Sequence, residues 1–407
     1  MSMALGALLL LLLAAPAKGG DARDTLVLQG GREIEGRILL ETEEKVLFQS
    51  GSRKKWYPRS AIKGTRSVAA SHRELLERFG TLAPESPEAL LDLASWCRDQ
   101  QLPHEEKLLL WRILVSSPEH EEANLRLGHR KVGEAFKAPL KGNWVSVTSL
   151  DAAHSEWSRA WELRSEHFTV RCSAGLQRTL DTLFELEFLY DAFYSLHQEE
   201  LLLLHLTDPV NVQMYPDRTS FPSMGSNVGA FFSKDENTLY TYLEESGRPR
   251  ALFHEGTHAL LHNVSERTTG TKGKFPSWLD EAWAVHMETI VVPERSGKPR
   301  LDPDRLSLPL LEAVATETDP YSITRILNLE TADFGASSKQ QLKYGQAYAL
   351  FHYMLIGEPR LRERFVTYIR SALEGKGQSS TFTRLFKPEL DFIEAAHVKY
   401  ARDAVGR

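Results

Sequence analysis

The segment His254-Glu255-Gly256-Thr257-His258 constrains this chain more than any other, because its two histidines stand four residues apart. Residues at this spacing lie one above the other on the same face of a helix. Two imidazoles so placed can bind one metal ion, and a glutamate between them is near enough to act on a water that the ion holds. The segment therefore predicts a helix that carries two ligands of a metal site.

The composition is that of an ordinary globular protein. The chain has 407 residues, of which 42% are hydrophobic and 26% charged, and this length predicts two or three domains. Its net charge of −6 gives no reason to expect a nucleic-acid partner. The dense basic run Arg53-Lys54-Lys55 lies between two strand-like segments, so we expect a solvated hairpin tip there.

The N-terminus has the pattern of a signal peptide over residues 1–17. An apolar run over residues 4–15 ends in Ala15-Pro16-Ala17, which fits an A-x-A cleavage site, although Met1-Ser2-Met3 lacks the usual basic residue. The run is too short to span a membrane, and no later segment is long and apolar enough to do so. We therefore expect an exported protein (periplasmic, cell-envelope or secreted) with no transmembrane segment after cleavage.

The chain has two cysteines, Cys97 and Cys172, which are too few for a disulfide scaffold. They fall in segments that we expect to belong to different domains. The prediction is two separate, buried thiols.

Residues 25–68 have the pattern of a small β module. Short strand-like segments over 26–28, 33–40 and 46–48 are separated by turn residues at Gly30-Gly31 and Gly51-Ser52. This spacing predicts a small SH3-like or Sm-like barrel, which is a common type of structural or interaction unit.

Residues 70–145 are expected to be helical. Ser86-Pro87 marks the start of one helix, a second follows Pro103, and a third is expected from Glu121 to Val132. Paired helices of this length resemble tetratricopeptide repeats (TPRs). Two interpretations stay open, a helical spacer and a surface that docks another protein.

From about residue 160 to 407 the pattern becomes α+β. Strands are expected over 168–171, 210–215, 227–232 and 238–243, with a long helix over 176–204 between the first two. The helix that carries His254 and His258 follows, and most of the remaining chain is helical.

Catalytic zinc takes three protein ligands and leaves a position for water, so a third ligand is needed beside the two histidines. A metzincin would have Gly three residues and His six residues after the second histidine, but those positions hold Leu261 and Val264, which excludes that class. The other common arrangement takes a Glu from a later helix. Residues 275–282 open such a helix, and it contains Glu281.

The run from Trp278 to Ala284, WLDEAWA, resembles the W-L-x-E-G-x-A element of gluzincins, the peptidase MA-like superfamily of zinc metallopeptidases. The resemblance implies that Glu281 is the third zinc ligand, although Ala282 stands where Gly is usual. The run from Tyr344 to Leu350 is similar to a helix of gluzincin-like domains in exported bacterial proteins of unknown function. The resemblance to gluzincins extends over the chain from about residue 162 onward and implies a thermolysin-like domain.

Three further positions have expected roles. Glu288 lies seven residues after Glu281 and returns to nearly the same helix face, where it can orient a histidine ligand. Tyr344 is the candidate donor to a developing oxyanion, with Tyr348 and His352 as weaker candidates, and a merely packed helix tyrosine is the other interpretation. Residues 228–231 fit either an edge strand that pairs with substrate or an ordinary strand.

The predicted fold is thus multidomain, with a small all-β barrel, a helical repeat-like segment and an α+β thermolysin-like (gluzincin) domain. The predicted function is an exported zinc-dependent metallopeptidase in which His254, His258 and Glu281 bind Zn²⁺ and Glu255 is the general base on the zinc-bound water. The substrate is a peptide or protein, and the N-terminal segments are a possible site for a protein partner. The alternative is a catalytically inactive relic that acts as a cell-envelope protein-binding module. No acidic anchor for a substrate amino terminus precedes the helix, which favours endopeptidase action.

Overall fold

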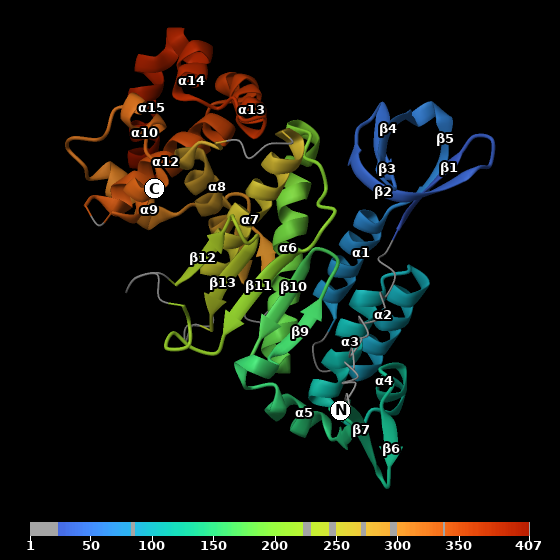
Figure 1. Cartoon of the computed structure of the whole chain (residues 1–407). Coiled ribbons are helices and arrows are strands. Elements are labelled where there is room, and N and C mark those ends of the chain that lie inside the picture. Colours follow the sequence, from blue (N-terminus) through green and yellow to red (C-terminus); the bar gives the residue numbers. More distant parts are fainter. Residues whose placement is uncertain are drawn as a thin grey trace, which may run out of the picture.

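A computed structural model describes residues 23–82, 86–222, 229–243, 250–269, 274–293, 299–336 and 338–406. The protein is multidomain and mixed α/β, with several sheets (Figure 1). The expected signal peptide, residues 1–17, lies outside the described residues. None of the helices in the described part of the chain has the length and apolar character needed to cross a membrane.

The N-terminal β module is a strongly curved antiparallel sheet at one side of the molecule (Figure 1). Its small core contains Leu26, Ile38, Val46 and Phe48, which alternate along their strands with more exposed residues. The strands are β1 (Asp24–Leu28), β2 (Glu33–Glu41), β3 (Lys45–Ser50), β4 (Arg53–Pro58) and β5 (Ile62–Arg66), and they pair in the order β4-β3-β2-β1-β5.

Two details of this module differ from expectation. In the pairing of the described strands, β4 and β5 are the two edges of an open sheet, so the expected closed barrel is not found. The basic run Arg53-Lys54-Lys55 is exposed as predicted, but it forms the start of β4 and pairs with β3, while Gly51 at φ +60° occupies the turn.

The helical segment begins as expected. The Ser67 side chain accepts the backbone N–H of Ala70, and the Ser86 side chain accepts that of Ala89. These bonds cap the first two helices. The helices are α1 (Val68–Thr81), α2 (Pro87–Asp99), α3 (Pro103–Ser116) and α4 (Glu121–Arg126).

The prediction that residues 70–145 are helical throughout is wrong for their last part. The helix that starts at Glu121 ends at Arg126, and Gly128 follows at φ +79°. Gly133 and Gly142, also at positive φ, then form two tight turns that favour hairpins over helix. The result is a three-stranded sheet of β6 (Arg130–Val132), β7 (Ala135–Leu140) and β8 (Asn143–Val145), followed by the short helix α5 (Val147–Ala153).

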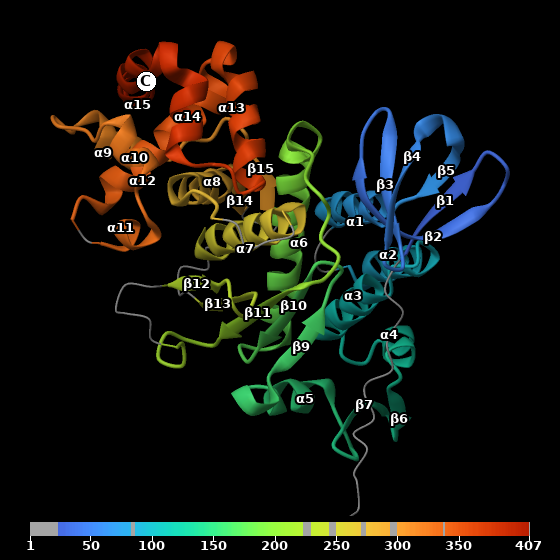
Figure 2. The same cartoon turned by 45° about the horizontal axis from the view of Figure 1, so that its top comes forward.

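The central sheet has the strand order β12-β13-β11-β10-β9. Its three inner strands are parallel, and both edge strands are antiparallel to their neighbours. Helices α6 (Leu176–Leu201) and α7 (Arg250–Thr269) lie on one face of this sheet (Figure 2). The strands are β9 (Trp161–Arg164), β10 (Phe168–Cys172), β11 (Val210–Tyr215), β12 (Ala230–Ser233) and β13 (Thr238–Tyr242). The last four lie close to the predicted ranges, whereas β9 was not predicted.

Helix α8 (Ser277–Ile290) packs between α7 and the C-terminal helices. It is buried on nearly all sides, with Trp278 and Trp283 fully inaccessible, which is the pattern of a core helix. The elements that follow it are β14 (Val291–Pro293), β15 (Pro299–Leu301), α9 (Leu308–Ala315), α10 (Ile323–Leu327), α11 (Thr331–Gly335), α12 (Gln340–His352), α13 (Pro359–Leu373), α14 (Ser379–Phe386) and α15 (Leu390–Val405).

The helical segment shares its hydrophobic core with the α+β part. Phe79 of α1 stacks on Phe184 of α6 with ring centroids 4.2 Å apart. Cys97 and Cys172 are both buried in this common core and are not bonded to each other, which confirms the prediction of two separate thiols. The helices α1–α3 are therefore part of the support of α6 and do not form a core of their own.

We expect substitution of Gly345 by Ala to destabilise the protein, because α12 approaches α9 closely at this position. An added Cβ would lie 2.4 Å from the backbone oxygen of Leu310 and 2.9 Å from Val314 Cγ2. Overpacking of this kind costs about 1–3 kcal/mol in the free energy of unfolding. Urea denaturation of the purified variant measures the change.

Gly80→Ala is the matched control, since Gly80 also lies in a helix but nothing stands within 4 Å of its added Cβ. Alanine should stabilise that helix by about 0.5–1 kcal/mol. Equal effects of the two substitutions would contradict the close packing of α12 on α9.

Candidate metal centre

Helix α7 presents His254 and His258 on one face, as their spacing predicts, with ring centroids 4.9 Å apart. Gly256 lies between them on the side that contacts α6. A Cβ at this position would be 2.6 Å from Leu189 Cδ2 and 3.5 Å from Leu186 Cδ2. The glycine thus allows α6 to pack directly behind the histidines, which holds α7 in place.

Glu281 of α8 faces both histidines. Its Oε2 atom is 3.3 Å from His254 Nε2 and 3.5 Å from His258 Nε2. Two ligand atoms bound to one tetrahedral zinc at about 2.0–2.2 Å stand roughly 3.3–3.6 Å apart. The distance of each Nε2 atom from Glu281 Oε2 is therefore that of two ligands on one zinc, and it is wider than a close histidine–carboxylate hydrogen bond.

The other nitrogen of each imidazole contacts a carboxylate. His258 Nδ1 is 2.7 Å from Asp280 Oδ1, and His254 Nδ1 is 3.2 Å from Glu288 Oε2. An Nδ1–H that donates to a carboxylate leaves the Nε2 lone pair available for a metal and orients the ring. Glu288 thus lies where its predicted role requires.

Asp280 is the site residue that sequence reasoning missed. It is buried, precedes Glu281 directly and also forms an ion pair with Lys234, with Nζ 3.3 Å from Oδ2. The only sequence signal was a second acidic residue beside the expected ligand. Adjacent residues of a helix point in different directions, so the position of Asp280 beside Glu281 does not by itself predict that both contact His258. The contact of Asp280 with His258 depends on how α7 packs on α8.

The carboxylate of Glu255 lies near the imidazole rings of His254 and His258. One carboxylate oxygen of Glu255 and one ring nitrogen of each histidine all lie within 4.8 Å of one another. Its Oε2 atom accepts the backbone N–H of Phe232 at 2.9 Å. Burial raises the pKa of Glu255, and His258 and His254 counteract that rise. The carboxylate is thus held by the edge strand β12, while Val228 at the start of the expected strand lies outside the described residues.

Tyr344 of α12 reaches the same place. Its ring centroid is 6.3 Å from that of His254, and its other side packs on Phe334 at 5.1 Å. Burial raises the pKa of Tyr344, and the neighbouring carboxylates of Glu281 and Glu255 raise it further. The hydroxyl is therefore protonated at neutral pH and can donate a hydrogen bond.

The two weaker candidates on α12 lie elsewhere. The Tyr348 hydroxyl accepts the backbone N–H of Ser307 at 3.4 Å, and His352 Nδ1 is 2.8 Å from the Tyr400 hydroxyl. These contacts direct Tyr348 toward the start of α9 and His352 toward α15. Tyr344 is the one of the three that the fold brings to the histidines.

The charges around the histidines favour a cation. Burial alone would lower the pKa of His254, but hydrogen bonds to Glu281 and Glu288 raise it to about 9. Glu255 and Asp280 add further negative charge, which Lys234 offsets in part. Two imidazoles and one carboxylate in such a field are a ligand set that suits zinc.

Residues 250–376 match a family described as "Protein of unknown function (DUF1570)". The match spans α7, α8 and α12, and so contains His254, His258, Glu281 and Tyr344. A search of the curated proteins found no match.

We expect Asp280→Asn to weaken zinc binding by about 10–100-fold, because the amide no longer supplies the charge that makes His258 a strong ligand. Glu288→Gln should have a smaller effect, since Glu288 is more exposed and its contact of 3.2 Å is longer than that of Asp280 at 2.7 Å. Competition with a chromophoric chelator measures the dissociation constants. Asp304→Asn, at an exposed position, serves as control. Unchanged affinity in Asp280→Asn would remove Asp280 from the site.

Proposed function

We propose that this protein is a zinc-dependent metallopeptidase of the gluzincin type. The observation that carries the proposal is that His254 Nε2 and His258 Nε2 stand 3.3 Å and 3.5 Å from Glu281 Oε2, the spacing of ligands on a tetrahedral zinc, while a carboxylate contacts the other nitrogen of each histidine. The resemblance of the α8 sequence to the gluzincin element supports the same assignment.

Zinc bound by these three residues would supply Lewis acidity, which lowers the pKa of a water and polarises a carbonyl. The chain supplies the proton transfers. Glu255 accepts a proton from the attacking water and passes it to the departing amine. Its raised pKa suits both tasks, because a carboxyl that holds the proton more firmly is a better base and remains protonated long enough to act as an acid.

The backbone N–H of Phe232 keeps Glu255 in position for this role. Because that bond uses Oε2, the second carboxylate oxygen remains for the proton of the water. Tyr344 donates its hydroxyl hydrogen to the oxyanion that develops on the attacked carbonyl. Its raised pKa means that it acts as a donor and keeps its own proton throughout.

The surrounding fold is compatible with a thermolysin-like domain that acts on an extended peptide. Strand β12 is the antiparallel edge of the mixed sheet and contacts the helix that carries the histidines. An edge strand offers unpaired backbone groups to which a peptide substrate can add as a further strand. We further propose that the protein is exported, that the N-terminal β module is of SH3-like or Sm-like type, and that the TPR-like helices beside it serve as a site for a protein partner.

Glu255→Gln should retain zinc and lose hydrolysis, because the amide keeps the hydrogen bond to Phe232 but cannot accept the proton. A loss of about 10²–10⁴-fold is expected from removal of a general base. Cleavage of a fluorescence-quenched peptide library by the zinc-loaded protein gives the rate, and elemental analysis gives the zinc content. Glu312→Gln, at an exposed position on α9, is the matched control.

Undiminished cleavage by zinc-loaded Glu255→Gln would refute the assigned mechanism. If the unaltered protein bound zinc but cleaved no peptide or protein offered, the alternative of an inactive binding module would be favoured.

Tyr344→Phe should lower kcat and leave zinc content unchanged, because the substitution removes one donor that acts on the transition state. Loss of an oxyanion donor costs about 10²–10³-fold in kcat, and KM should change little. Tyr348→Phe removes a hydroxyl from the same helix, but one that contacts Ser307, and should keep full activity. A similar kcat for both variants would mean that Tyr344 has only a packing role.

A further inference from the structure

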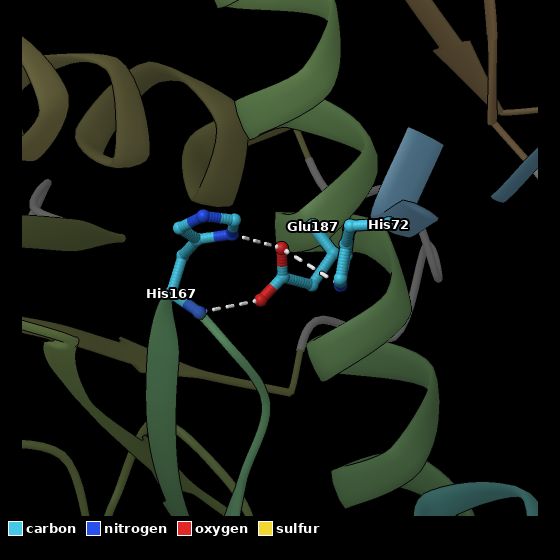
Figure 3. A group of neighbouring side chains, drawn as sticks. All are labelled: His72, His167 and Glu187. Atoms are coloured by element: carbon cyan, nitrogen blue, oxygen red, sulfur yellow. Dashed lines mark hydrogen bonds and ion pairs between the residues drawn. The ribbon is translucent and has the colours of Figure 1, made fainter. Parts of the chain in front are cut away.

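A second cluster of metal-binding side chains lies away from the site described above. His72 of α1, His167 just before β10 and Glu187 of α6 point toward one another (Figure 3). One ligand atom from each lies within 4.8 Å of those of the other two, and all three residues are buried. Their distances along the chain give no local motif, so sequence analysis did not detect them.

The two histidines relate to the carboxylate in different ways. His167 donates its backbone N–H to Glu187 Oε1 at 2.8 Å, and its Nδ1 is 2.7 Å from Oε2. His72 Nε2 stands 3.5 Å from Glu187 Oε2 and 3.5 Å from Glu105 Oε1, and it has no hydrogen-bond partner. His167 therefore makes a direct hydrogen bond, whereas His72 does not.

The candidate catalytic site contains the same two kinds of contact. The orienting bonds from His258 Nδ1 to Asp280 and from His254 Nδ1 to Glu288 are 2.7 Å and 3.2 Å long, while the ring nitrogens that face Glu281 stand 3.3 Å and 3.5 Å from it. The wider spacing is that of atoms around a tetrahedral zinc. By this comparison His72 faces its carboxylates as a metal ligand does.

The charges of the second cluster require a cation. Glu105 of α3 and Glu187 are 1% and 2% exposed, and the ion pairs of both are with histidines. Glu105 Oε1 accepts the backbone N–H of Glu166, but Glu105 Oε2 is buried with no hydrogen-bond partner. The neighbouring Glu166 is paired with Arg37, with Nη1 2.7 Å from Oε1. Buried carboxylates are costly unless a positive charge compensates them.

Either a proton on His72 or a metal ion can supply that charge. Burial alone would lower the pKa of His72, but Glu187 and Glu105 raise it to about 9. A protonated imidazole normally approaches a carboxylate to within about 2.7–2.9 Å. His72 Nε2 stands farther than this from both carboxylates, which favours an ion between them.

We infer that His72, Glu187 and Glu105 bind a second divalent metal ion, for which zinc is best suited, and that His167 orients Glu187. The site is buried, which suits a structural ion, and its three protein ligands leave the fourth position of a tetrahedral zinc to a buried water molecule. It joins α1 and α3 to α6. Helix α6 also contacts Gly256 through Leu186 and Leu189, so the ion would stabilise the support of α7.

Zinc stoichiometry of the full chain tests the inference. The protein is supplied with zinc, dialysed against a weak chelator and analysed for metal per chain by mass spectrometry. The unaltered protein should retain about two zinc ions per chain. The double variant His254→Ala/His258→Ala lacks the ligands of the first site and should retain about one.

Two further variants identify where the remaining ion binds. Adding His72→Gln to the double variant should remove it, while adding His197→Gln should not. His197 of α6 is a matched control because it is buried like His72 but lies outside the cluster. Circular dichroism verifies that each variant is folded.

Retention of one zinc ion by the unaltered protein and none by the folded double variant would overturn the inference and leave the proposed function intact. His72 would then carry a proton in place of a metal. The same conclusion would follow if the folded His72→Gln triple variant kept its ion. If that variant fails to fold, the stoichiometries of the unaltered protein and the double variant still decide.

Discussion

The packing of α7 against α8 is the contact on which the candidate site depends. Each helix carries residues whose side chains have no function until the other helix is in place. The bond from His258 to Asp280 and that from His254 to Glu288 both cross this contact, and Glu281 meets the two histidines there. The fully buried Trp278 and Trp283 fix how α8 is rotated, because Trp278 stacks on Tyr368 and Trp283 on Phe193.

Residues that depend on local helical geometry could be predicted from the sequence. The spacing of His254 and His258, and that of Glu281 and Glu288, places each pair on one face whatever surrounds the helix. The Asp280 contact and the Phe232 N–H on Glu255 could not be predicted, because each joins elements whose relative placement depends on the whole core. Tyr344 stood between these cases, since its helix was predictable but the direction of the ring was not.

The fold shows the same division. The strands of the central sheet and the long helix before β11 follow from the alternation and spacing of apolar residues. Residues 130–145 were misjudged because their hairpins depend on Gly133 and Gly142 in positive φ, and glycine has little effect on hydrophobic periodicity. Whether the N-terminal sheet closes into a barrel depends on hydrogen bonding between its edge strands β4 and β5. The alternation of apolar residues along each strand does not determine that pairing.

The two His–Glu clusters use the same side-chain chemistry but differ in access. His254 and Glu255 are partly exposed, and the ring of Tyr344 lies beside that of His254. His72, His167, Glu187 and the neighbouring Glu105 are all buried. Helix α6 separates the clusters, with Glu187 facing one and Leu186 and Leu189 lying behind the other. The packing of α6 thus links the second cluster to the placement of α7, the helix that carries His254 and His258.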